Sequence, residues 1–299
     1  MAEYRVLTVQ PQDLIGDEAL GSKTKFWFRR DNQDWLFKEA REGTGEDWAE
    51  KVAAEVAHVV GVPAATVELA EFQGRRGCAS LSFVDRRAGE GLIHGNEILA
   101  GMVLGYDRGK RFHQSDHTLE NIQLAIQRLF PEKAMHDGVL TTLAGYLVLD
   151  ALIGNTDRHH ENWALLLQQV RNDAEVNLML RVAPSFDHAS SLGRELQDTK
   201  RLNLLRSDAV GRYARNGKGA IYLATFDTHG ANPLRLVEFG ARRFAEYFVP
   251  TIRRLGQVAP PDFRRILNCV PANRMSDASK DFAYAFMAYT YTALKKLLK

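Results

Sequence analysis

The sequence predicts an α+β protein of two lobes, with a small β-rich N-terminal lobe and a larger, mainly helical C-terminal lobe. Two observations support this. Short strand-like segments separated by turn residues fill the first part of the chain, and helical spacing dominates the rest. At 299 residues the chain has room for both units and shows no internal repeat. We expect the N-lobe to span residues 1–85 and the C-lobe residues 86–299.

The strands of the N-lobe are recognised by aromatic-rich runs around turns. Residues 25–41 (KFWFRRDNQDWLFKEAR) predict a hairpin with its polar turn at 31–34. Residues 65–72 (ATVELAEF) and 78–84 (CASLSFV) predict two more strands, on either side of a glycine-containing turn.

One helix is expected between these two pairs of strands. In residues 46–63 (EDWAEKVAAEVAHVVGVP), Trp48, Val52, Val56 and Val59 recur at helical spacing. Acidic residues occupy the first turn, and a Gly-Val-Pro sequence ends the pattern. The N-lobe is therefore expected to be an antiparallel sheet that carries one helix.

The C-lobe is expected to be built mainly from helices, with one hairpin. The polar, basic residues 194–218 predict a mobile loop with some helix. The other expected elements are helices at 117–130, 138–154, 233–255 and about 279–299, and a hairpin of strands at 163–170 and 175–183.

Composition excludes several classes of protein. The apolar fraction of 45% and the charged fraction of 25% are those of a globular protein with a sizeable core. The only cysteines, Cys78 and Cys269, exclude a disulfide framework and a zinc ribbon. The N-terminus does not resemble a signal peptide, and no apolar run approaches the ~18 residues of a membrane span. We expect a cytoplasmic protein.

The net charge of +2 says little about partners. From Ala231 to Lys299 there are 12 Lys or Arg residues against 5 Asp or Glu residues. Such a surplus can attract nucleic acid or acidic protein, but solvated faces of terminal helices explain it more simply. Direct nucleic-acid binding is not expected.

The stretch NTDRHHEN (residues 155–162) carries the chemistry. Asp157 and Asn162 stand five residues apart between a buried helix and the expected hairpin, and Asp187 follows that hairpin. Phosphoryl transfer uses such a set: one carboxylate orients the attacking hydroxyl, while an amide and a second carboxylate bind Mg²⁺. The spacing Asp-x₄-Asn is that of a protein-kinase catalytic loop, although the His-Arg-Asp tripeptide is absent.

The N-lobe offers residues for the phosphates of ATP. Lys38 ends the strand WLFK, and Glu50 on the next helix is placed to pair with it, with Glu55 as a rival. Residues 16–25 (GDEALGSKTK) supply glycine, serine and lysine before a strand, where backbone N–H groups bind phosphate. They match neither Walker A nor GxGxxG.

Hydrolase chemistry is less well supported. His159, His160 and Glu161 suggest a metal site, but HExxH is absent and adjacent side chains tend to point apart. We expect His159 to support the catalytic loop by hydrogen bonds. GxSxG, the serine-hydrolase motif, does not occur.

These residues resemble a known family. DALIGNTDRHHENWALL with APSFDHASSL is similar to the HipA-like kinases, which include the toxin kinases of bacterial toxin–antitoxin systems. GSKTK corresponds to their phosphate loop, WLFK to their ATP lysine, and AEKVAAEVAHVVGVP to their glutamate-bearing helix. The resemblance covers about Gly21 to Ser191 and implies the bilobal fold shared by protein kinases and lipid kinases.

The resemblance implies a role for each matching residue. Asp157 would be the catalytic base, and Asn162 and Asp187 the Mg²⁺ ligands. Lys38 would hold the nucleotide phosphates and Glu50 would hold Lys38, in preference to Glu55. The phosphate loop would contribute Gly21, Ser22, Lys23 and Lys25, with Ser22 at a position that some members autophosphorylate.

The resemblance implies an ATP- and Mg²⁺-dependent serine/threonine protein kinase. Family toxins phosphorylate the translation apparatus, aminoacyl-tRNA synthetases in particular, so a protein substrate of that kind is expected. The chain resembles compact members that lack the N-terminal subdomain of HipA. Because no DNA-binding partner module is recognised in the sequence, any antitoxin is expected on a separate chain. Two alternatives stay open: a lipid or small-molecule phosphotransferase, and a nucleotide-binding module without catalysis.

Overall fold

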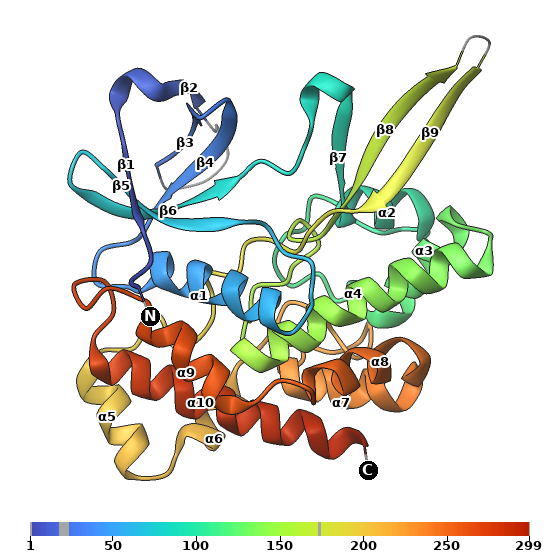
Figure 1. Ribbon diagram of the computed structural model, residues 1–299. Helices are drawn as coiled ribbons and strands as arrows, with labels where there is room; N and C mark the ends of the chain where they lie inside the picture. The colour runs from blue at the N-terminus through green and yellow to red at the C-terminus, as the bar shows by residue number, and fades with distance from the viewer. Residues whose placement is uncertain (1, 18–23, 173–174, 299) are drawn as a thin grey trace.

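In the computed structural model, which describes residues 2–17, 24–172 and 175–298, a β-sheet lobe sits above a larger helical lobe (Figure 1). The expected α+β class and the arrangement of a small β-rich part and a larger helical part are confirmed. The sheet lobe contains the strands β1 to β6 and the helix α1 (Glu46–Val59), and the other helices form the lower lobe.

The N-terminal sheet has six strands in the order β1-β5-β6-β4-β3-β2. The strands are β1 (Val6–Val9), β2 (Leu14–Asp17), β3 (Lys25–Arg30), β4 (Gln33–Glu39), β5 (Val67–Phe72) and β6 (Arg75–Leu81). The expected hairpin is β3–β4. Its turn residues Asp31 and Asn32 have φ of 51° and 58°, and positive φ at both central residues matches the twist of paired strands. The strands β1 and β5 pair in parallel, and the other pairs are antiparallel.

The helix α1 packs beneath this sheet, against β5 and β6. Trp48, Val52 and Val56 are buried as the apolar spacing predicted, while Val59 at the C-terminal end is 40% exposed. Gly61, with φ of 69°, follows the helix in the left-handed region that favours glycine. The helix therefore presents one face to the sheet, and the chain then returns to that sheet as β5.

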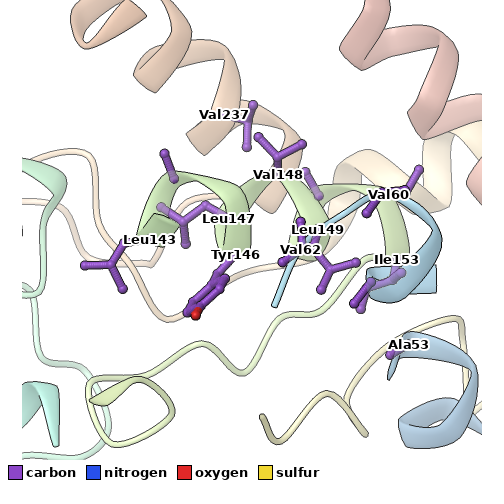
Figure 2. Packing of buried hydrophobic residues seen from close by; sticks show 14 of the residues in the cluster. Ala53, Val60, Val62, Leu143, Tyr146, Leu147, Val148, Leu149, Ile153 and Val237 are labelled. Carbon is purple, nitrogen blue, oxygen red and sulfur yellow. The ribbon is translucent and has the colours of Figure 1, made fainter. Parts of the chain in front are cut away.

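The helix α4 (Lys133–Ile153) is the centre of the helical lobe, and it is buried from Val139 onward. Figure 2 shows its apolar side chains between Val237 on one side and Val60 and Val62 on the other. Among the described helices, α4 alone is long and apolar enough to cross a membrane. However, 72% of its apolar 18-residue stretch is buried inside the protein. That burial is what a core helix requires.

A second sheet has three strands in the order β7-β8-β9 and projects from the body of the molecule (Figure 1). The strands are β7 (Glu90–His94), β8 (Ala164–Asn172) and β9 (Glu175–Val182). The hairpin of β8 and β9 was expected, and β7 was not. β7 runs directly into the helix α2 (Gly95–Met102), and α3 (Leu119–Leu129) follows.

The rest of the C-lobe is more helical than the sequence indicated. Residues 194–218, expected as a mobile loop with some helix, contain α5 (Asp198–Arg206) and α6 (Val210–Asn216), and Val210 and Ala214 pack on Phe282 and Phe286. The single helix expected at 233–255 is two, α7 (Pro233–Arg243) and α8 (Ala245–Leu255), which meet at the buried Phe244. Then come α9 (Pro260–Asn268), which was not anticipated, and α10 (Asp277–Lys295).

Candidate active site

The candidate catalytic loop begins where α4 ends. Gly154 closes the helix with φ of 71°, and a β-carbon there would lie 2.4 Å from the ring of Phe286. Only glycine meets both conditions. The hydroxyl of Thr290 donates a hydrogen bond to the carbonyl of Leu152, which ties the last turn of α4 to α10. The start of the loop is thus fixed by the core helices.

A buried ion pair holds this loop to α4. Arg158 donates from Nε to Asp150 Oδ2 and from Nη2 to Asp150 Oδ1, each at 2.8 Å. Asn155 also donates to Asp150 Oδ1 at 2.8 Å, and its own amide oxygen accepts from the backbone N–H of Asp157. All but Asp157 are almost fully buried. Because both charges are paired bidentately, their burial is tolerated and their geometry is well defined.

The same guanidinium joins the loop to the segment that contains Asp187. Arg158 Nη1 donates to the carbonyls of Asn162 and Phe186, at 2.5 and 3.2 Å, and Nη2 donates to Ser185 Oγ at 2.9 Å. Two stretches separated by the β8–β9 hairpin therefore share one anchor. This anchor ties the backbone of Asn162 to that of Phe186, the residue before Asp187.

Asp157 is oriented from within the loop. The Asn162 amide nitrogen donates to the carbonyl of Asp157 at 2.7 Å, so the amide oxygen of Asn162 is the end that can face a cation. The side chain of Asp157 is 44% exposed. Its partial burial is the larger cause, and the negative charge of Asp187 the smaller one, of a pKa raised above the ordinary value of aspartate.

Lys38 from β4 reaches into the same place. Its ammonium donates to Asp187 Oδ1 at 2.9 Å. This contact and the field of Glu50 raise the pKa of Lys38 against the opposing effect of burial, and Lys38 in turn lowers the pKa of Asp187. Asp187 has φ of 62°, a strained conformation for a residue other than glycine and one that concentrates at functional sites.

Glu50 is buried beside this pair, but the ammonium of Lys38 is bonded to Asp187 rather than to Glu50. One carboxylate oxygen of Glu50 lies 3.6 Å from His188 Nδ1, and the other has no hydrogen-bond partner within the described structure. His188 Nε2 is 2.7 Å from Ser185 Oγ, which continues the contacts to Arg158. The rival Glu55 lies elsewhere, in an ion pair with Lys51.

The phosphate loop expected at Gly21, Ser22 and Lys23 lies outside the described residues. Lys25, the last residue of that expected set, begins β3 and is opposite Lys38 in the strand register. Its charge also contributes to the lowered pKa of Asp187. Lys25 thus faces the same site as Lys38.

His117, which packs beside the loop, and His159 within it have structural contacts. His117 Nδ1 donates to the carbonyl of Ala220 at 3.0 Å, and its Nε2 accepts from Trp163 Nε1. His159 contacts Arg111 from the 103–117 connection, with Nε2 3.1 Å from Nη2 of Arg111. Burial lowers the pKa of His117 and of His159 to about 3, so both rings are neutral near pH 7.

These two histidines make stability depend on pH. Unfolded histidine titrates near pH 6.5, so below that value the unfolded chain binds protons that the folded state excludes down to about pH 3. As the pH is lowered below about 6.5, the free energy of unfolding is expected to fall by up to ~1.4 kcal/mol for each unit of pH and each histidine. Urea unfolding at several pH values between about 7 and 5.5 measures the slope. A flat profile over that window would contradict the assignment.

The donor set fits a magnesium ion. The Asp187 carboxylate and the Asn162 amide oxygen are hard oxygen ligands, and Mg²⁺ needs only one or two protein ligands beside substrate phosphates and water. No cluster of three or more His, Cys, Asp or Glu side chains occurs within the described residues, so an all-protein metal cage is not offered there. Asn162 and Asp187 are the residues that would hold the ion.

Sequence reasoning missed the residues that hold the site together. These are Asp150, Asn155, Arg158, Ser185 and His188. One signal could have indicated Asp150: it is a lone charge within the long apolar run of α4, and a buried charge requires a partner. Ser185 and His188 carry no such signal, because their contacts to Arg158 and to Glu50 join residues that are distant in the sequence.

Comparison with known proteins gives a family match and two structural neighbours. Residues 18–245 match the family model described as HipA-like C-terminal domain. No curated protein matches the chain. The structure is similar to the crystal structure of the proinflammatory kinase CtkA of Helicobacter pylori, with a TM-score of 0.74, 18% identity, and coverage of 97% of this chain and 95% of that chain.

It is also similar to HipA in the Shewanella oneidensis complex of HipA, HipB and operator DNA. There the TM-score is 0.60 and the identity 11%, and the match covers 97% of this chain and 66% of that chain. At such identities the likeness concerns the fold, and the expected bilobal kinase-like fold is confirmed.

Proposed function

The chain belongs to the HipA-like C-terminal domain family, and on this premise we propose that it is an ATP- and Mg²⁺-dependent kinase acting on serine or threonine hydroxyls of a protein. The observation that carries the proposal is the set of contacts and charges linking Lys38 of β4, Asp157 and Asn162 of the loop after α4, and Asp187 after β9. That set supplies a base, two hard oxygen ligands and a cation for phosphate.

In the proposed reaction Asp157 orients the acceptor hydroxyl and accepts its proton while the hydroxyl oxygen attacks the γ-phosphorus and the bond to ADP breaks. The raised pKa of Asp157 suits a base that works near neutral pH. Mg²⁺, when bound by Asn162 and Asp187, would neutralise charge on the phosphates. Lys38 is within reach of Asp187, so its ammonium lies where phosphate oxygens would be held.

Glu50 is proposed to stabilise that ammonium from its buried place beside His188. Its field already raises the pKa of Lys38, and one of its oxygens has no partner within the described structure. A movement of the Lys38 ammonium from Asp187 to Glu50 would satisfy that oxygen and leave Asp187 to the metal. The phosphate-loop residues Gly21, Ser22, Lys23 and Lys25 are proposed to bind the nucleotide phosphates.

The cellular role is a further part of the proposal. A toxin kinase of the translation apparatus, with an aminoacyl-tRNA synthetase as one candidate substrate and a cytoplasmic location, agrees with the family. The HipA structure that resembles this chain is a complex with HipB and operator DNA, so an antitoxin on a separate chain is proposed here too. Growth arrest on expression, absent in Asp157→Asn, tests the toxin role.

The first experiment is mass spectrometry of the whole protein after incubation with ATP and Mg²⁺. We expect a mass increase of one phosphoryl group, and peptide mapping tests Ser22 as its position. The increase is expected to vanish with EDTA. If nucleotide binds and no phosphoryl group is transferred, either to the chain or to protein acceptors, the alternatives gain: a kinase of lipids or small molecules, or a module without catalysis.

A further inference from the structure

The connection between α2 and α3 presents an exposed run of charged residues beside the active site. Residues Asp107 to His113 (DRGKRFH), here called the basic segment, contain three cations and one carboxylate, and all seven are exposed. Asp107 Oδ1 accepts from the N–H of Gly109 at 2.9 Å, and the buried Gln114 donates to the carbonyl of Asp107 at 2.6 Å. The segment is therefore held in one shape although it is on the surface.

Arg111 places this segment at the catalytic base. Its guanidinium lies 3.1 Å from His159 Nε2 and 3.5 Å from Glu161 Oε2, and His159 Nε2 is 4.0 Å from the Asp157 carboxylate. The positive charge of Arg111 also acts on Asp157, where it opposes the rise in pKa. An acceptor hydroxyl hydrogen-bonded to Asp157 would thus lie within about 10 Å of Arg111, with His159 between Arg111 and Asp157.

The rest of the segment is available to a partner. Arg108 and Lys110 are exposed, and neither side chain forms an ion pair within the part of the chain that the structure describes. Phe112 keeps 69% of its surface exposed and lies under Arg111, with the guanidinium 5.6 Å from the ring centroid. Two unpaired cations and an exposed aromatic ring beside a catalytic carboxylate are a surface suited to a ligand.

We propose that the basic segment binds acidic residues of the polypeptide that is phosphorylated, close to the acceptor hydroxyl. The inference rests on the proposed kinase function. An extended chain advances about 3.3–3.6 Å per residue. Since the hydroxyl must be within hydrogen-bonding distance of Asp157, side chains within about three positions of it can reach Arg108, Lys110 and Arg111.

Protein is favoured over RNA as the occupant because of the small extent of the segment. RNA is normally held by a groove of many cations along its backbone or by several stacking rings. Here three cations and one aromatic ring lie within seven residues, next to a base that requires a hydroxyl of the acceptor. One or two carboxylates on a polypeptide match that charge.

The test compares serine peptides that carry either aspartate or alanine within three positions of the acceptor. For the full chain with ATP and Mg²⁺, kcat/KM is expected to be higher for acidic peptides by about tenfold, the effect of a few exposed ion pairs. The double variant Arg108→Glu/Lys110→Glu is expected to remove that preference and to leave neutral peptides within about twofold, since neither side chain contacts the catalytic loop. The matched control is Arg242→Glu, an exposed arginine of α7.

A binding measurement decides the inference even without phosphate transfer. Fluorescence anisotropy of labelled acidic and neutral peptides, with ADP and Mg²⁺, is expected to show tighter binding of the acidic peptide to wild type and to Arg242→Glu only. The proposal is overturned if wild type binds the acidic and the neutral peptide equally well. It is also overturned if the double variant and Arg242→Glu lose affinity for the acidic peptide to the same extent. Binding of a single-stranded RNA, but not of acidic peptide, that is lost in the double variant overturns it in favour of nucleic acid. Failure of phosphate transfer with preserved acidic preference overturns only the kinase function.

Discussion

Replacing Asp157 with asparagine is expected to lower phosphate transfer by a factor of about 10²–10⁴, the usual contribution of a positioned general base. Asparagine has nearly the same shape and keeps the hydrogen bond from Asn162, which goes to the backbone carbonyl rather than to the side chain. The substitution therefore removes the proton acceptor without changing the loop. Nucleotide binding is expected to persist.

The same substitution is expected to leave the folded state as stable as wild type or slightly more stable. Asp157 has a raised pKa in the folded protein, so folding disfavours its charged form. A raised carboxyl pKa lowers stability once the pH is above the ordinary range of aspartate, and a neutral side chain removes that effect. Loss of activity with an unchanged or higher Tm thus indicates a functional residue rather than a structural one.

The measurement is initial-rate phosphate transfer beside thermal unfolding, with Asp31→Asn as the matched control. Asp31 is a mostly exposed turn residue at positive φ, which asparagine tolerates. The control is expected to retain both activity and Tm. Transfer at wild-type rate in Asp157→Asn would remove Asp157 from the role of base.

Replacing Arg158 with alanine is expected to be the most destabilising single change in the site. It leaves the buried carboxylate of Asp150 without its charge partner, and it frees the carbonyls of Asn162 and Phe186. Breaking a buried pair by removing one partner costs about 3–5 kcal/mol. That is a large part of the ~5–15 kcal/mol by which proteins are stable.

Urea and thermal unfolding measure this effect, and Arg29→Ala is the matched control. Arg29 pairs bidentately with Asp34, but at the surface, where such a pair contributes about 0–1 kcal/mol. If Arg158→Ala lowers the free energy of unfolding no more than the control does, Asp150 is not held by this pair. If the variant is too unstable to purify, Arg158→Lys keeps the charge and loses the bidentate geometry, so an intermediate loss is expected.

Local patterns allowed much of the N-lobe to be predicted. The β3–β4 hairpin, α1 and the pair β5 and β6 follow from alternation, helical spacing and turn residues, all of which act within a few neighbouring residues. The break between α7 and α8 could not be predicted in this way, because the helical spacing of apolar residues continues through the buried Phe244, where the two helices meet. Some helix was expected in residues 194–218, but its extent could not be predicted because its apolar residues pack on α10, far along the chain.

The candidate site divides in the same way. The residue types expected for phosphoryl transfer, and their order along the chain, could be predicted from the sequence alone: Lys38, Glu50, Asp157, Asn162 and Asp187. Their contacts could not: in the folded protein Lys38 bonds to Asp187, and Glu50 lies beside His188.

The bonds from Arg158 to Asp150 and to the carbonyls of Asn162 and Phe186, and the contact between Arg111 and His159, also appear only in the folded protein. Distance explains the difference. A motif records which groups are near one another in sequence, whereas ion pairs and shared hydrogen bonds depend on positions in space that the packing of distant elements sets.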